Sequence, residues 1–412
     1  MGDEIKLPPF NQISTALRET TERLARELAQ PQASAPGWTQ FEWDMARVSS
    51  AAQGISGLLA NRLRWRGPDD WQEFLRWEQY QTVLRDLRIA AVMKRLNSAL
   101  RNEVVPVIAL KGAALREMSL YAAGERPMGD IDLLGEAANF PAIARALHTL
   151  GYRESPSCER HQVFVADTRT TVVGFGEHIA NSLNVEVHPA ISEPLPLSLV
   201  DVSPQIFGRR LGPGINSYPS LAALMTHLLL HAAGNIRTHA LRLVQLLDIA
   251  LLGKRMSPQD WDEVAAGQRA WWVLPPLLLA QRYFGSFVPD ASNEKFRTAC
   301  PAYLAFAARR YTLTGVSWSN LRIAAFPGIA WSRSLGEAAR FAYSRARPTR
   351  TALADLQDTL ERQPHLTQVS WYQLPHWMRI ARWVFTRPPR VQTIAAVRAA
   401  LSEQPHPRRA AF

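Results

Sequence analysis

The sequence has 412 residues, 47% of them hydrophobic, and a formal net charge of +11 at pH 7, a length that predicts roughly two or three domains with ample core. No run approaches about eighteen uncharged apolar residues, and the start MGDEIKLPPF lacks an apolar signal region, so we expect no transmembrane segment and a cytoplasmic location. Cys158 and Cys300 form no CxxC pair and the arginines are scattered, which argues against a disulfide framework, a cysteine-rich zinc site and a nucleic-acid partner.

Residues 1–97 carry helical patterns. An Arg/Glu-rich stretch over Gln12–Leu28 predicts a first helix, and the following AQPQASAPGW indicates a linker. We therefore expect a mobile, loosely attached start. From Phe41 to Asn97 apolar residues recur at helical spacing, which predicts helices that flank the next segment.

A strand followed by a glycine turn is predicted next. Val104–Leu110 is short, uncharged and rich in β-branched residues, and it ends on Lys111-Gly112 before the helical AALREMSLYA. The first backbone N–H groups of a helix lack intrahelical partners, so a phosphate can bind at such an end. Gly112 leaves this position without a blocking side chain, and Lys111 adds a positive charge.

Two aspartates lie on the second predicted strand, Met128–Leu134. Because side chains alternate along a strand, Asp130 and Asp132 project to one face, roughly 6.6 Å apart at about 3.3 Å per residue. Ile131 and Leu133 then point into the core. Carboxylates spaced in this way can share Mg²⁺. Arg126, in the turn before this strand, is a candidate phosphate ligand.

The segments LKGAAL and YAAGERPMGDIDLL, between Leu110 and Leu134, resemble the bacterial "uncharacterised nucleotidyltransferase" family, within the nucleotidyltransferase superfamily of DNA polymerase β. The resemblance extends from about Leu84 to Pro289, and some family members accompany genes for lasso-peptide and other natural-product biosynthesis. It implies an NTP such as ATP as substrate and Mg²⁺ or Mn²⁺ as cofactor. Superfamily members usually carry Ser after the glycine, where this chain has Ala113.

The resemblance also implies a third carboxylate on a later strand. Leu183–His188 reads LNVEVH, so its polar face carries Glu186 and His188. Glu186 is the candidate third metal ligand or the base that deprotonates an acceptor hydroxyl. His188 is a candidate supporting residue beside it.

The sheet around these strands is expected to be small and mixed. Phe140–Leu150 is helical in pattern and Gly151 ends it, whereas His161–Ala166 and Thr171–Phe175 predict antiparallel strands. No GxGxxG follows the first strand, which argues against a dinucleotide-binding fold.

Leu-rich helices are predicted from Pro219, beginning with PSLAALMTHLLLHAAG and THALRLVQLLDIALLG, each ended by Gly. His227 and His231 share a helix face, where core packing is favoured over joint metal ligation. Asp248 is costly to bury alone, so we expect a partner such as Arg242, His227 or His231. This helix pair could also close over the carboxylates and help to position substrate.

Near the end, Trp377, Ile380 and Val384 could share one helix face, either packed on the helical domain or resting on a membrane surface. The sequence thus predicts an α+β fold: a small mixed β-sheet nucleotidyltransferase core flanked by N-terminal helices and a large C-terminal helical domain. The expected divisions are 1–97 for the helical flank, 98–200 for the core, 201–403 for the helical domain and 404–412 for a disordered tail.

The predicted function is metal-dependent transfer of a nucleoside monophosphate from an NTP to a hydroxyl or phosphate of an acceptor. A small molecule, a peptide, a protein side chain or tRNA could accept it. Asp130, Asp132 and Glu186 would hold the metal, and Lys111, Gly112 and Arg126 the phosphates. The alternative is a catalytically silent member that binds a nucleotide or a biosynthetic partner, which Ala113 favours.

Overall fold

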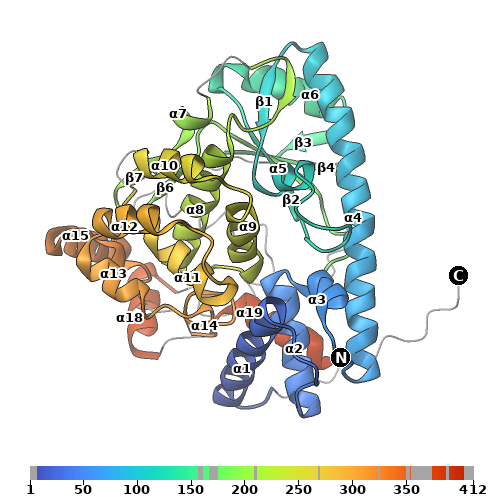
Figure 1. The fold of residues 1–412 in the computed structure, drawn as a ribbon, viewed down its shortest axis with the longest axis vertical. Coiled ribbons are helices and arrows are strands. Elements are labelled where there is room, and N and C mark those ends of the chain that lie inside the picture. Colours follow the sequence, from blue (N-terminus) through green and yellow to red (C-terminus); the bar gives the residue numbers. More distant parts are fainter. Residues whose placement is uncertain are drawn as a thin grey trace, which may run out of the picture.

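The computed structural model describes residues 7–155, 161–166, 175–207, 211–267, 270–322, 325–348, 353, 374–386 and 389–402. Helix α4 (Asp69–Asn102) has 34 residues and lies along one long side of the molecule, with a mixed sheet beside it and a large helical region on the other side (Figure 1). The α+β layout expected from the sequence is confirmed. Helix α4 runs past the expected division at residue 97.

The N-terminal helices are firmly packed. Helix α1 (Phe10–Ala29) lies against α2 (Gln40–Gln53), and Ile13 and Leu24 on it are fully buried. The expectation of a loosely attached first helix is therefore wrong for α1. A capping box begins α2, in which Thr39 and Glu42 exchange side-chain and backbone hydrogen bonds. Helix α3 (Ser56–Arg62) then packs on α4.

The main sheet has six strands in the order β3-β4-β5-β2-β1-β8. Strands β1 and β2 are antiparallel, whereas β2 and β5 are parallel neighbours with Asp132 opposite Glu186. The mixed sheet is thus confirmed, and its central pair carries the predicted carboxylates. The strand bounds are β1 Pro106–Ala109, β2 Asp130–Leu134, β3 Tyr152–Glu154, β4 Gln162–Ala166, β5 Asn184–His188 and β8 Gly214–Asn216.

One face of the sheet is apolar. Ile131, Leu133, Val185 and Val187 are fully buried there, in a cluster that includes side chains of α4 and α6 (Phe140–His148). This confirms the alternation expected for β2 and leaves the carboxylates on the opposite face. Strand β4 pairs with β3 and β5. Residues 171–174 of the other expected strand lie outside the described residues, and Phe175 lies in a bend.

Helices α8 (Leu221–Thr238) and α9 (Leu243–Gly253) pack as the expected pair. Gly234 does not end α8, which continues to Thr238 and closes on His239 in the left-handed conformation. The largest core cluster joins Leu24 of α1, Leu134 of β2 and Leu246 of α9, so flank, sheet and helical region share one core. Further elements are α5 Lys111–Glu117, β6 Ser192–Pro194, β7 Leu199–Asp201, α7 Ser203–Ile206, α10 Pro258–Ala266, α11 Leu274–Phe284, α12 Asp290–Ala299, α13 Ala302–Ala308, α14 Leu313–Val316 and α15 Leu335–Ala346.

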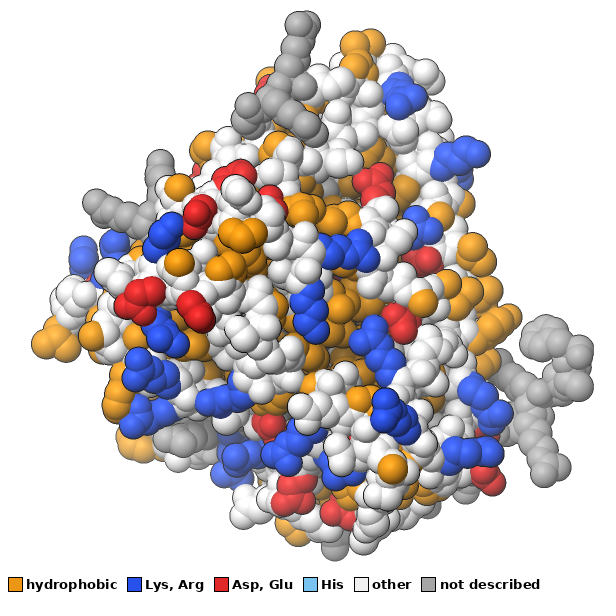
Figure 2. Space-filling model, in the orientation of Figure 1, with side chains coloured by type: hydrophobic (Ala, Val, Ile, Leu, Met, Phe, Trp, Pro, Cys, Tyr) orange, Lys and Arg blue, Asp and Glu red, His pale blue; other side chains and the backbone are white. Residues whose placement is uncertain are grey.

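The last described helices are α18 (His376–Thr386) and α19 (Val391–Ser402), and α19 packs on α2. Ile380 is buried, whereas Trp377 and Val384 are exposed, so these three do not form a common buried face. The expected tail, Gln404–Phe412, lies outside the described residues. Within the described part of the chain, every helix is too short or too polar to cross a membrane. Basic side chains on the face shown in Figure 2 are spread over its middle and lower parts and its upper right edge, with acidic groups among them.

Candidate active site

The predicted strand, glycine turn and helix are present. Strand β1 leads through Leu110 into α5 (Lys111–Glu117), which is shorter than the expected helix, and Lys111 adopts a positive φ of 42°. A Cβ on Gly112 would stand 2.6 Å from Met128 Sδ and 2.7 Å from Arg126 Nη1. A larger residue at this position would therefore displace the Met128 and Arg126 side chains that pack against Gly112.

The acidic residues converge on the open face of β2 and β5. Asp130 and Asp132 alternate with buried residues on β2, and the parallel register places Asp132 directly opposite Glu186. His188 follows Glu186 on the same face of β5. Residues about 50 positions apart in the sequence thus meet because two neighbouring strands run in the same direction.

Asp132 is held by two cationic or polar neighbours. Its Oδ1 accepts a hydrogen bond from Lys111 Nζ at 3.3 Å and lies 3.0 Å from His188 Nε2. Glu186 lies 3.7 Å from His188 and 3.5 Å from His161. The rings of His161 and His188 stack at 4.9 Å between centroids, because β4 runs antiparallel to β5 with Gln162 opposite Val187.

The charged groups of this cluster shift one another's pKa values. Burial, together with the nearby negative charges of Asp132 and Glu186, raises the pKa of Asp130 to about 7. Burial also opposes ionisation of Asp132, but Lys111 and His188 outweigh it and hold the pKa of Asp132 below its ordinary value. The pKa of Lys111 is raised, since the attraction of Asp132 and Asp130 exceeds the effect of burial. Three carboxylates beside one lysine therefore leave an excess of negative charge.

A divalent cation fits this donor set. One ligand atom each from Asp132, Glu186 and His188 lies within 4.8 Å of the others. Carboxylate oxygens are preferred ligands of Mg²⁺ and Mn²⁺, and a cation would offset the repulsion that raises the pKa of Asp130. The residues present thus suit a metal, with Asp130 next to this group on the same strand face.

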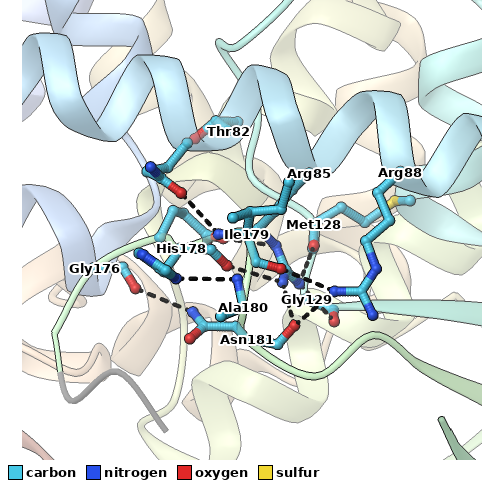
Figure 3. Close-up of polar contacts among 12 residues, drawn as sticks. Thr82, Arg85, Arg88, Met128, Gly129, Gly176, His178, Ile179, Ala180 and Asn181 are labelled. Carbon is cyan, nitrogen blue, oxygen red and sulfur yellow. Dashed lines mark hydrogen bonds and ion pairs between the residues drawn. The ribbon is translucent and has the colours of Figure 1, made fainter. Parts of the chain in front are cut away.

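Arg85 holds the loops that precede the two carboxylate-bearing strands, β2 and β5. This buried side chain of α4 donates to the carbonyls of Met128 and Gly129, directly before β2, and to those of His178 and Asn181, ahead of β5 (Figure 3). Its guanidinium also pairs with Glu177 at 3.0 Å. The sequence pattern placed Arg85 only on a helix, since nothing local indicates that its partners lie in two distant loops.

Arg126 and Asp248 form a buried ion pair. Arg126 Nε and Nη2 donate to the two carboxylate oxygens at 2.8 and 2.7 Å, and Tyr121 donates to Oδ1 at 2.7 Å. The expected partners of Asp248 were therefore wrong: Arg242 instead donates to the carbonyls of Ala51 and Ala52. The pair ties helix α9 to the turn before β2, with Nη1 left facing Gly112.

His227 and His231 line a cavity of about 460 Å³ that also borders Lys111 and His188, the two neighbours of Asp132. His227 Nδ1 lies 2.6 Å from the Tyr218 hydroxyl, and His231 Nε2 lies 3.1 Å from Asn235 Nδ2. Burial and the charge of Lys111 lower the pKa of His231 to about 3, and that of His227 is also lowered. Both rings are neutral at pH 7. The cavity is lined by Leu110, Lys111, His161, His188, Pro189, Ala190, Ile191, Ser192, Glu193, Leu199, His227, Leu230 and His231.

A mixed sheet that presents carboxylates beside a strand, glycine turn and helix defines a nucleotidyltransferase core. Residues 39–289 match the model of the family described as "Uncharacterised nucleotidyltransferase", and the chain belongs to this family. The match starts before the expected Leu84 and ends at the expected Pro289. Comparison with curated proteins and with solved structures gives no match.

Proposed function

We propose that the protein is a metal-dependent nucleotidyltransferase. It moves a nucleoside monophosphate from an NTP to a hydroxyl or phosphate of a small molecule, peptide or protein, and releases pyrophosphate. The observation that carries this proposal is the convergence of Asp130, Asp132 and Glu186 on one strand face beside the Lys111–Gly112 turn.

The glycine turn is the proposed site of the NTP phosphates. Gly112 lets the Arg126 guanidinium approach the first turn of α5 closely, and Lys111 supplies a positive charge that already faces Asp132. Asp248 occupies two of the three guanidinium nitrogens of Arg126, so that Nη1 is directed toward Gly112. Arg126 thus offers a hydrogen-bond donor to a phosphate, and the buried carboxylate of Asp248 fixes the direction of this donor.

Asp130, Asp132 and Glu186 are the proposed metal-binding carboxylates. When bound at this position, Mg²⁺ or Mn²⁺ would neutralise charge on the leaving pyrophosphate and activate the acceptor oxygen. Asp132 is nearly buried, whereas about a quarter of the Glu186 side chain is exposed. Glu186 can therefore be reached by an acceptor and can accept its proton.

Labelled substrates test the reaction type. Purified protein is incubated with divalent metal, each of the four NTPs and a cell extract or candidate biosynthetic peptide as the acceptor source. Attack at the α-phosphorus transfers the α-label to the acceptor and leaves the γ-label in pyrophosphate. Transfer of the γ-label would instead identify a phosphotransferase and overturn the proposal.

A catalytically silent member of the family is the second candidate. The residue after Gly112 is Ala113, which is buried and has no hydroxyl to offer a phosphate. Calorimetric titration with ATP, GTP, CTP and UTP in the presence of Mg²⁺, followed by the transfer assay, separates the two functions. Binding of an NTP without transfer of either label to any acceptor supports the silent member.

A further inference from the structure

We infer that His188 is a ligand of the bound cation, so that the site is a mixed carboxylate–imidazole site that prefers a first-row transition ion to Mg²⁺. This inference rests on the proposed metal-dependent function and specifies which metal the same site takes. His188 lies with Asp132 and Glu186 in one group of possible ligands, and Asp130, the remaining proposed metal-binding carboxylate, stands next to them on β2.

The separations of His188 Nε2 from the two carboxylates match those between ligands of a single ion. For metal–ligand bonds of about 2.1 Å, two ligands lie between about 3.0 Å apart at a right angle and about 4.2 Å apart on opposite sides. His188 Nε2 lies 3.0 Å from Asp132 Oδ1 and 3.7 Å from Glu186 Oε2. The imidazole nitrogen therefore stands where a third ligand belongs.

The backbone holds these three groups in place. Glu186 and His188 are alternate residues of β5 and project to the same face, while the parallel register sets Asp132 beside them on β2. Stacking on His161 restrains the plane of the His188 ring. The arrangement is thus fixed by two strands in the centre of the sheet and by the ring of His161, the residue directly before β4.

An imidazole ligand changes which metal ion the site prefers. Mg²⁺ takes oxygen ligands and retains several waters, whereas imidazole nitrogen suits first-row transition ions, whose affinities for nitrogen-containing sites are higher. A nitrogen among the protein ligands therefore favours an ion such as Mn²⁺ or Zn²⁺ over Mg²⁺.

Pulsed electron paramagnetic resonance of Mn²⁺ bound to the full chain tests this directly, because it detects nitrogen nuclei in the metal's ligands without any substrate. We expect ¹⁴N modulation in the wild-type protein, replaced by the ¹⁵N pattern when only histidine is labelled with ¹⁵N. His188→Gln should lose this nitrogen signal, whereas His231→Gln, which alters a histidine of the same cavity, should keep it. His188→Gln should also reduce the ratio of Mg²⁺ to Mn²⁺ dissociation constants about tenfold or more.

The ¹⁵N-histidine experiment needs no substitution, so it decides the question even where His188→Gln fails to fold. Absence of Mn²⁺ binding, or bound Mn²⁺ without a histidine nitrogen signal, would overturn the inference. So would an unchanged signal in His188→Gln. Nucleotidyl transfer with Mg²⁺ and no histidine ligation refutes the inference alone, whereas histidine ligation without transfer refutes the proposed function alone.

Discussion

The ion pair between Arg126 and Asp248 gives a quantitative test of how the helical region is tied to the site. Asp248 is 1% exposed, and it accepts two hydrogen bonds from Arg126 and one from Tyr121. Asp248→Asn keeps the shape of the side chain but removes its charge and replaces one acceptor by a donor. The guanidinium of Arg126 then remains buried without a counter-charge.

Breaking one side of a buried ion pair costs about 3–5 kcal/mol. We expect Asp248→Asn to lower the free energy of unfolding by about 3 kcal/mol, the lower end, because the amide oxygen still accepts one hydrogen bond. The change is measured by urea unfolding followed by tryptophan fluorescence. Replacing both partners, in Arg126→Met/Asp248→Leu with Tyr121→Phe, should recover much of the loss, since no buried charge is left unpaired.

The matched control is Asp262→Asn, the same substitution in the pair that Asp262 forms with Lys295 at 2.8 Å, where both side chains are more than half exposed. This variant should leave the unfolding midpoint unchanged, because water screens the pair. The reasoning is refuted if Asp248→Asn is as stable as the control, or if the triple replacement is less stable than Asp248→Asn alone.

Three further variants test other parts of the account. Arg85→Lys should lower the free energy of unfolding by about 2–3 kcal/mol and weaken metal binding, because an ammonium cannot span the carbonyls of both loops; unchanged urea midpoint and metal affinity would contradict this. Lys111→Ala should weaken NTP binding about tenfold or more in calorimetry, and it should also lower the melting temperature, because Asp132 stays buried without this cation. Lys254→Ala, an exposed control at the end of α9, should change neither. Full NTP affinity in Lys111→Ala would make Lys111 structural. Because the pKa of His231 is lowered to about 3, the unfolded state binds more protons at this site below pH 6.5, so the contribution of His231 to stability is complete above that pH and declines as pH falls toward 3. At pH 5 this contribution is lower by about 2 kcal/mol, so the change in unfolding free energy between pH 7 and pH 5 should differ by that amount between wild type and His231→Gln in urea unfolding.

Local patterns were sufficient to predict the strand face that carries the carboxylates. The alternation of Asp130 and Asp132 with apolar residues requires only that the segment be a strand, and the same holds for Glu186. That β2 and β5 are parallel neighbours depends on the whole sheet, but a buried apolar face on both strands already restricts how they can pack. The glycine turn could also be predicted from the sequence, since it lies between two elements that are adjacent along the chain.

The contacts that reinforce the site could not be predicted in this way. Arg126 and Asp248 are separated by 122 positions, and Arg85 contacts two loops that precede different strands. The partners of these side chains therefore depend on tertiary packing. The helix α1 was expected to be loose because a linker follows it, yet its threonines meet the hydroxyl of Ser49 in α2. Sequence composition next to a helix says little about which distant surface that helix covers.

The most direct test of nucleotidyl transfer at this site compares wild-type protein with Asp130→Asn and Asp132→Asn. Transfer of α-label and release of pyrophosphate are measured with the NTP and acceptor source that support activity, and circular dichroism verifies folding. The account predicts that each substitution slows transfer by about 10²-fold or more, since each removes a metal-binding carboxylate at nearly constant volume, while Asp262→Asn retains the wild-type rate. Near wild-type transfer by both folded variants would contradict the central claim.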